Sequence, residues 1–228
     1  MNIKEGLIYF SNIAFELGKW AFLVLVLGTI VHYFLATVFV ISGPSMEPEF
    51  HDGQIFIVSR IGLFSGKYSR GDPMVIKFPG VPDSKKYIKR LIALPQEKIQ
   101  IKNNEVFIND KKIYESYVRP VDEMFLPYFY ENPKWKEEAE NLHSQGKVLT
   151  KPDLVRKLDD KEYFLMGDNR ENSNDSRKWY PAGKSDLIGP VVFILGQIKT
   201  DPDCIGFCIT KFSFTGWGPI VSPYYSEQ

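Results

Sequence analysis

Residues 167–177 form a run of polar side chains with two aspartates, two arginines, two serines and three asparagines. Such side chains can hydrogen-bond a reacting group or a charged partner, but they cannot form an apolar core. The run follows the strand-like residues 163–166, so we expect a loop at the end of a strand. It fits a calcium loop poorly, because Arg170 stands where a ligand is needed and no glycine follows at the sharp turn. A solvated loop and a loop that supports an active site both remain open.

A serine lies on a rigid turn in residues 42–48. Ser45 stands between Pro44 and Pro48, with Gly43 nearby, so this segment cannot be a helix or the middle of a strand. A serine on such a turn can present its hydroxyl as a nucleophile and leave its own backbone N–H for an anion.

Lys89 lies in residues 86–94, a segment of mixed polar and apolar residues that is predicted to contain a strand. In a strand, Lys89 shares one face with Tyr87 and Leu91, which would remove part of its water. Desolvation disfavours the ammonium and lowers the lysine pKa from its usual value of about 10.4, so that the neutral amine becomes a usable base. The alternative is a lysine whose stem packs on the sheet while its ammonium reaches water.

Taken in order along the chain, four segments resemble the conserved segments of the type I signal peptidases, which are membrane-bound serine proteases with a Ser-Lys dyad. The segments are Ser45-Met46, residues 70–79, Tyr87-Ile88-Lys89-Arg90 and residues 167–177. Four ordered segments behind an apolar one are more specific than any of them alone. The resemblance extends from about Trp20 to Val192.

This resemblance implies a role for each matching residue. Ser45 would be the nucleophile, and Lys89 the general base that takes its proton. Ser173 matches the serine that hydrogen-bonds the base and fixes its position. Two pairs of charged residues would hold the loop in place, namely Arg90 with Asp168 and Asp175 with Arg177. Gly43 falls where some members carry a serine that helps to bind the oxyanion, so here the oxyanion would depend more on backbone N–H groups.

Histidine is the alternative base. His51 is close to Ser45 in the sequence, but it lies in a turn over residues 50–53 that is expected to point its side chain to solvent. His32 and His143 lack partners at metal-ligand spacing, so no metal and no cofactor are expected.

The composition excludes some classes of partner. The 228 residues carry a formal net charge of +0 and no basic block, so nucleic acid is not expected as a partner. The two cysteines, Cys204 and Cys208, lie too near the end of the chain to form a framework for the fold, and their state is left undecided.

Residues 20–41 carry no charge and are numerous enough to cross a bilayer with a hydrocarbon core of about 30 Å. The run is longer than a usual signal-peptide core and no small-residue cleavage pattern follows it, so it is predicted to be an uncleaved transmembrane anchor. Residues 1–19 would be a short cytoplasmic segment, because Lys4 and Lys19 precede the span whereas Arg60 is the first basic residue after it. Ser45 would lie within roughly 13 Å of the end of the span.

Residues 42–228 are predicted to be a mainly β catalytic domain, with antiparallel strands. Runs typical of strands cover residues 54–58, 74–78, 87–92, 98–101, 105–108, 163–166 and 190–194. Paired asparagine and aspartate residues at 103–104 and 109–110 predict the turns of a small meander over residues 98–113. Residues 119–160 differ in composition, because an aromatic run over residues 125–130 is followed by a charged run over residues 134–140. They are predicted to be a small accessory insertion, with a short helix over residues 134–140.

The function that the resemblance implies is a membrane-anchored serine endopeptidase that cleaves N-terminal signal peptides from exported preproteins. Its partners would be these preproteins and the lipid bilayer, next to the protein translocation channel. The catalytic domain would lie on the extracytoplasmic side of the bacterial cytoplasmic membrane, with Phe214 and Trp217 in the interface. A Ser-Lys protease dedicated to one pilus or conjugation protein, and a catalytically silent anchored β module, are the alternatives.

Overall fold

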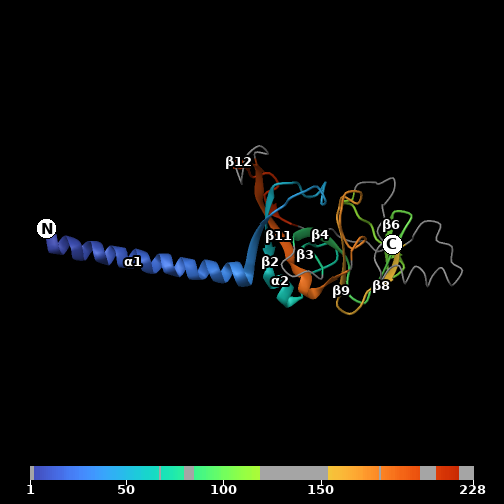
Figure 1. Ribbon diagram of the computed structural model, residues 1–228, viewed down its shortest axis with the longest axis horizontal. Coiled ribbons are helices and arrows are strands. Elements are labelled where there is room, and N and C mark those ends of the chain that lie inside the picture. The colour runs from blue at the N-terminus through green and yellow to red at the C-terminus, as the bar shows by residue number, and fades with distance from the viewer. Residues whose placement is uncertain are drawn as a thin grey trace.

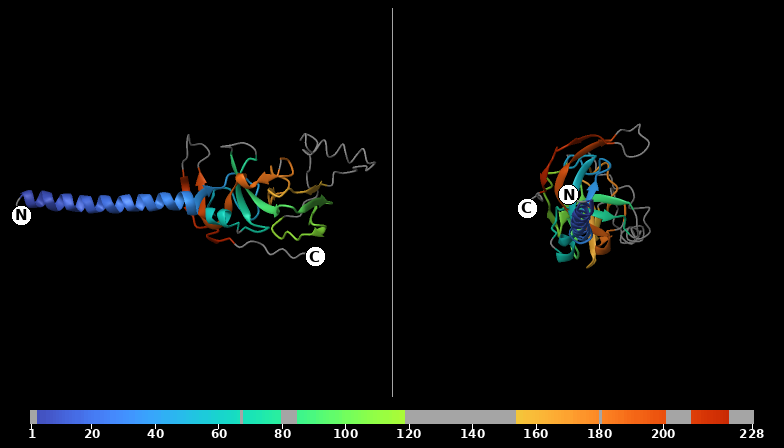
Figure 2. Two further views of the ribbon diagram at one scale, coloured as in Figure 1. Left: turned by 90° about the horizontal axis from the view of Figure 1, so that it is seen from below. Right: turned by 90° about the vertical axis from the view of Figure 1, so that its left-hand side faces the viewer.

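The computed structural model describes residues 3–66, 68–79, 85–118, 154–179, 181–200 and 209–220. A long helix, α1 (Ile3–Ile30), projects from one end of a β body, and the remaining described elements form that body (Figure 1). The two views of Figure 2 show α1 leaving the body along its long axis. Cys204, Cys208 and the predicted short helix at residues 134–140 lie outside the described residues.

The remaining helical elements are η1 (Val31–Leu35), α2 (Arg60–Ser65) and η2 (Lys184–Asp186). The strands that belong to the larger sheet are β1 (Ala36–Val40), β2 (Gln54–Ser59), β3 (Pro73–Lys77), β4 (Lys86–Ala93), β9 (Glu162–Met166), β10 (Ala182–Gly183), β11 (Leu187–Thr200), β12 (Ile209–Ser213) and β13 (Gly218–Pro219). The smaller sheet consists of β5 (Lys98–Lys102), β6 (Glu105–Ile108), β7 (Lys111–Lys112) and β8 (Leu154–Lys157).

The larger sheet has the strand order β1-β2-β11-β3-β4-β9-β10, with β12 and β13 also paired to β11. The neighbouring strands in this order pair antiparallel, which confirms the predicted mainly β, antiparallel class. Four antiparallel steps separate β1 from β4, so these two strands run in the same direction. The smaller sheet has the order β7-β6-β5-β8 and includes the predicted meander.

The meander forms where the sequence predicted it, because its turn residues tolerate a left-handed backbone. Asn103 and Asn104 have φ values of 50° and 63°, and Asn109 and Asp110 have values of 51° and 68°. Short polar side chains are the non-glycine residues that adopt this conformation most readily. The turns therefore connect β5 to β6 and β6 to β7 with few residues.

The apolar N-terminal segment differs from the predicted span of residues 20–41 at both ends. The helix begins at Ile3, the stretch long and apolar enough to cross a membrane is Tyr9–Leu35, and Ala36–Val40 form strand β1, which pairs with β2. Apolar composition alone does not distinguish a lipid-facing helix from an edge strand, and residues 36–40 include the β-branched Thr37, Val38 and Val40. Ser45 therefore follows the helical segment by ten residues, which raises the limit on its distance from that end to about 33 Å.

Strand β11 is also longer than predicted. It extends over Leu187–Thr200 instead of residues 190–194 and pairs with β2, β3, β12 and β13 along its length. Register shifts in its ladders with β2 and β3 allow one strand to serve several neighbours, because each bulge bends the strand locally.

One apolar cluster supports the turn that carries Ser45. Met46 and Phe50 are 0% and 2% exposed and pack with Phe56 of β2 and Ile88 of β4. Burying such side chains stabilises a fold by about 1.5–3 kcal/mol each. The residue that follows Ser45 is therefore fixed in the core, while Ser45 itself stays at the surface of that core.

Candidate active site

The Ser45 turn is held from two sides by hydrogen bonds. On one side, Asp52 Oδ1 accepts the Gly43 N–H at 2.7 Å. On the other, Asn169 donates its backbone N–H to Ser45 O at 3.1 Å and its side-chain amide to Pro44 O at 3.2 Å. Gly43 has a φ of +98°, a left-handed conformation that favours glycine. These contacts fix the backbone around Ser45. The direction in which its side chain leaves the backbone is therefore fixed as well.

Lys89 of β4 meets the serine. Its Nζ lies 2.6 Å from Ser45 Oγ, although 44 residues separate the two in the sequence. Lys89 is 1% exposed, so the alternative of an ammonium that reaches water is wrong. Burial lowers the pKa of Lys89 from 10.5 to about 8, even though Asp175 and Asp168 act in the opposite direction. About a tenth of the amine is therefore neutral at pH 7, far more than for a solvated lysine.

Arg90 and Asp168 form a buried, two-pronged ion pair. Arg90 Nε and Nη2 donate to the two carboxylate oxygens at 2.7 and 2.5 Å, and Arg90 Nη1 donates to Gly71 O at 2.8 Å. The guanidinium also lies 3.9 Å from the ring centroid of Tyr117. Because both partners are almost fully buried, this pair ties the polar loop to the strand that carries Lys89.

Asp175 and Arg177 form a second buried pair. Arg177 donates to Asp175 at 2.8 and 2.7 Å, and Asp175 also accepts the Gly167 N–H at 2.9 Å. Burial alone would raise the pKa of Asp175, but the charge and hydrogen bonds of Arg177 and the bond from Gly167 lower it to about 2. Asp175 therefore stays ionised and holds the two ends of the loop together.

Ser173 is brought to the site, but its geometry differs from the predicted hydrogen bond to the base. Its side chain is buried, and its Oγ has no well-formed hydrogen bond among the described residues. It lies close enough to Asp175 to contribute to that residue's low pKa. Its predicted bond to Lys89 is thus not formed in this structure.

Two supporting residues were not singled out from the sequence. Glu115 accepts two hydrogen bonds from the buried Arg170 at 2.8 and 2.5 Å, although it lies 55 residues earlier in the chain. Asn169 stood in the polar run without a role, and it contacts the Ser45 turn directly. The polar run was a signal for Asn169 and Arg170, whereas nothing local distinguished Glu115 from an ordinary surface glutamate.

His51 is exposed on its turn, as predicted, and the described partner of Ser45 Oγ is Lys89. The structure thus brings the lysine, and not the histidine, to the serine.

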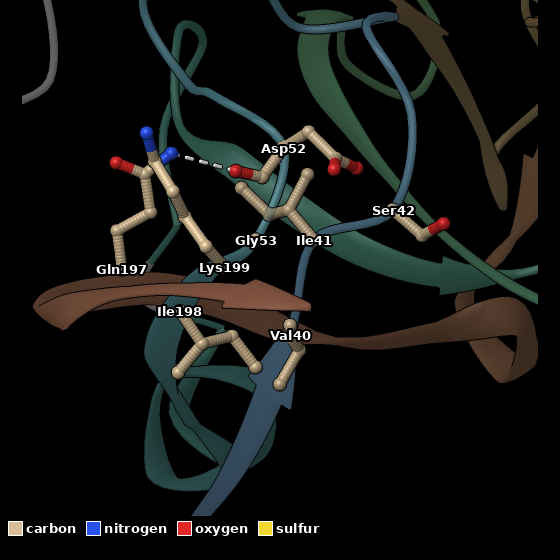
Figure 3. Close-up of a pocket in the computed structure, with 8 residues that line it drawn as sticks. All are labelled: Val40, Ile41, Ser42, Asp52, Gly53, Gln197, Ile198 and Lys199. Atoms are coloured by element: carbon tan, nitrogen blue, oxygen red, sulfur yellow. Dashed lines mark hydrogen bonds between the residues drawn. The ribbon is translucent and has the colours of Figure 1, made fainter. Parts of the chain in front are cut away.

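A cleft of about 450 Å³ opens beside Ser45. Its lining comes from β1 and the turn after it, from the start of β4 and from the core beneath, and it comprises Phe39, Val40, Ile41, Ser42, Ser45, Phe56, Val75, Lys85, Lys86, Tyr87 and Ile88. We call it the Ser45 cleft. A second cavity of about 510 Å³ adjoins the same segment and shares Val40, Ile41 and Ser42 with it (Figure 3). The second cavity does not include Ser45, so the Ser45 cleft is the one that can hold a reacting group.

Gly167 provides a test of how tightly the loop and the turn are packed. A Cβ on Gly167 would lie 2.4 Å from the backbone oxygen of Ser45 and 2.3 Å from Ser173 Oγ. We expect Gly167→Ala to displace Ser45 and lower kcat by about a hundredfold, since misplacement of a reacting group by 1 Å can cost that much. Gly183→Ala is the matched control, because its Cβ would meet nothing closer than 3.5 Å and activity should stay within twofold. Equal activity in both variants would contradict the described contact.

Comparisons with known proteins identify the family of the chain. A family model described as "Signal peptidase, peptidase S26" matches residues 14–196. The chain is 36% identical over 167 residues to "Signal peptidase I" of Bacillus licheniformis, which covers 73% of this chain and 80% of that protein. It is 35% identical to "Signal peptidase I T" of Bacillus subtilis over 73% of this chain and 77% of that protein. It is 32% identical over 192 residues to "Signal peptidase I P" of Bacillus subtilis subsp. natto, which is 84% of this chain and 93% of that protein. The range matched by the family model contains all the site residues described above.

Proposed function

The chain belongs to the peptidase S26 family and is a type I signal peptidase, a serine protease that cleaves signal peptides; from this premise we propose that Ser45 is its nucleophile and Lys89 its general base. The observation that carries the proposal is the 2.6 Å contact between Lys89 Nζ and Ser45 Oγ, in which the lysine is buried and its pKa is about 8. A serine is a weak nucleophile at its own pKa and needs a base within this distance.

The reaction then follows from the positions of these two groups. Neutral Lys89 accepts the hydroxyl proton as Ser45 Oγ attacks the scissile carbonyl, and the resulting ammonium returns a proton to the leaving amine. The acyl-enzyme is released by a water that Lys89 activates in the same way. Among the described residues Ser45 N–H donates no hydrogen bond to the protein, so it is available to donate to the oxyanion, and Gly43 adds no side-chain donor.

The substrate would lie as an extended chain in the Ser45 cleft. Among the described strands, β1 pairs only with β2. Strand β4 pairs with β9 from Arg90 onwards, so residues 86–89 expose an edge towards the cleft. An extended peptide can pair its main chain with such edges, while its side chains enter the floor of the cleft. Small residues at the first and third positions before the cut are what a signal peptide presents there.

The membrane anchor is a proposal that rests on helix α1 and η1. The stretch Tyr9–Leu35 is long and apolar enough to span a bilayer, and its most apolar part is not buried by the rest of the protein. We place the β body on the extracytoplasmic side of the bacterial cytoplasmic membrane, near the translocation channel, because preproteins emerge there. Phe214 and Trp217 are 72% and 62% exposed, which fits an interfacial position.

The direct test is cleavage of a purified preprotein by the full-length protein in detergent or liposomes. We expect one cut after a small-x-small motif, located by mass spectrometry of the mature product. A protein that leaves preproteins intact but binds them would overturn the proposal in favour of a binding module.

Truncation separates the anchor from the catalytic body. Removal of residues 1–35 should leave a protease that cuts short peptides at a rate close to that of the full chain, but that processes membrane-inserted preproteins at least tenfold more slowly, because it loses effective concentration. Removal of residues 1–41 also deletes β1, which pairs with β2 and lines the cleft, so peptide cleavage should be lost as well. Equal peptide activity in the two truncated proteins would contradict the assignment of β1 to the substrate cleft.

A further inference from the structure

The Ser45 cleft is bridged at both ends by contacts between its two walls. At one end Lys89 of β4 meets Ser45, which follows β1, at 2.6 Å. At the other end the ammonium of Lys86, also on β4, lies 5.1 Å from the ring centroid of Phe39 on β1. This distance is typical of a cation–π contact. The two walls, β1 and β4, run in the same direction. The contact at Ser45 marks one end of the Ser45 cleft, and the contact at Phe39 marks the other, which we call the far end.

The length of the Ser45 cleft limits how many substrate residues it can hold. Lys86 lies three positions before Lys89 along β4, which corresponds to about 10 Å in an extended strand. An extended peptide whose scissile carbonyl lies at Ser45 therefore reaches Lys86 with its fourth residue, and Lys85 with its fifth.

The direction of the peptide follows from the position of helix α1. Phe39 lies in strand β1, four residues after the helical segment ends at Leu35, and Ser45 lies ten residues after that end. We therefore take the Phe39 end of the cleft as the one closer to the proposed anchor. A signal peptide keeps its apolar segment, which precedes the cut, in the bilayer. The residues before the cut therefore enter from the Phe39 end and run parallel to β1 and β4.

Among the described residues, the far end of the cleft carries positive charges without a matching carboxylate. Lys85 and Lys86 are exposed, both line the cleft, and no aspartate or glutamate is among the residues that line it. Neither ammonium forms an ion pair with a carboxylate in the described part of the chain. The contact with Phe39 orients Lys86 across the cleft, where a fourth or fifth substrate residue must pass.

We propose that Lys86, assisted by Lys85, is a specificity-determining residue that favours an acidic over a basic side chain at the fourth or fifth position before the cut. The substrate displaces the ammonium from the Phe39 ring, and a substrate carboxylate then gives it a new partner. A basic side chain meets two like charges instead. The inference rests on the proposed function of the cleft and adds a charge preference to it.

The test measures kcat/KM for each of four proteins with each of a set of peptides. The peptides carry small residues at the first and third positions before the cut, and glutamate, glutamine or lysine at the fourth or the fifth. The full-length proteins are wild type, Lys86→Gln, Lys86→Glu and the control Lys102→Glu, which makes the same charge change at an exposed position of the smaller sheet. Lys86 is exposed at the first position of its strand, so these variants should fold.

For wild type and Lys102→Glu we expect kcat/KM to be about three- to tenfold higher for the glutamate peptide than for the lysine peptide, mainly through KM, since one exposed ion pair is worth up to about fivefold. The preference should nearly vanish in Lys86→Gln and reverse in Lys86→Glu, and it should weaken at high salt. The same ratio in all four proteins would overturn the inference.

Two further outcomes distinguish the charge preference from failure of the proposed function and from a contact between Lys86 and lipid. If wild type cuts none of the peptides and no preprotein, the proposed function itself is wrong. If the proteins cut the peptides but the glutamate-to-lysine ratio of kcat/KM is the same in all four, only the charge preference is wrong. If Lys86→Glu alters cleavage only when vesicles of anionic lipid are present, with no change in peptide ranking, then Lys86 contacts lipid phosphate and the inference is wrong.

Discussion

We expect Ser45→Ala and Lys89→Met each to abolish signal-peptide cleavage, with kcat at least a thousandfold below that of the wild type. In the proposed dyad the serine and the lysine act as one unit, so removal of either leaves no activated nucleophile. Methionine preserves the volume of the lysine stem in its buried position, so the fold should persist. The measurement is single-turnover cleavage of a preprotein, with circular dichroism to show that each variant is folded.

His51→Ala and Lys102→Met are the controls for this prediction. Both side chains are exposed, and activity should stay within a few fold. A tenth of wild-type turnover in a folded Ser45→Ala or Lys89→Met protein would contradict the dyad. A loss in His51→Ala as large as that in Ser45→Ala would instead assign the base to histidine.

The pH dependence of wild-type cleavage gives an independent check on the base. Burial lowers the pKa of Lys89 to about 8, and only the neutral amine can accept the serine proton. We therefore expect kcat/KM to rise about tenfold per pH unit at acidic pH and to level off above about pH 8. A limb that levels off near pH 6.5 would indicate a histidine, and one that still rises at pH 10 would indicate a solvated lysine.

The second large effect concerns the ion pair between Arg90 and Asp168. Asp168→Ala should lower the free energy of unfolding by about 3–5 kcal/mol, because it leaves a fully buried guanidinium without its carboxylate. Urea unfolding of the full-length protein in detergent measures this change. The cleavage rate should fall as well, since the pair ties the polar loop to the strand of Lys89.

Glu105→Ala is the matched control, because its ion pair with Lys112 is 43% and 47% exposed at the side chains. Its effect on the free energy of unfolding should stay within about 0.5 kcal/mol, as is usual for exposed pairs. Similar values for Asp168→Ala and Glu105→Ala would show that the buried pair does not support the fold.

The sequence by itself determined the parts of this protein that depend on local chemistry. The order of four motifs gave the family, and the asparagine-rich turns placed the β5-β6-β7 meander, since few residues adopt a left-handed backbone. Alternating or apolar runs located strands β2, β3, β4, β5, β6 and β9 and part of β11, because burial of one face leaves a period of two. The catalytic roles of Ser45 and Lys89 stay predictions, but the sequence was sufficient to name both residues.

Only the tertiary structure decided which distant residues meet and where the helix ends. The apolar residues 36–40 form strand β1 because β2 offers them hydrogen bonds, and apolar composition cannot reveal such a partner. Glu115 reaches Arg170 across 55 residues of sequence. Lys86 of β4 reaches Phe39 of β1 across the cleft, although four strand-to-strand steps separate β1 from β4 in the sheet. A sequence pattern reports which side chains will be buried, whereas pairing between strands is a non-local property, and that pairing places a buried lysine at a hydroxyl 44 residues away.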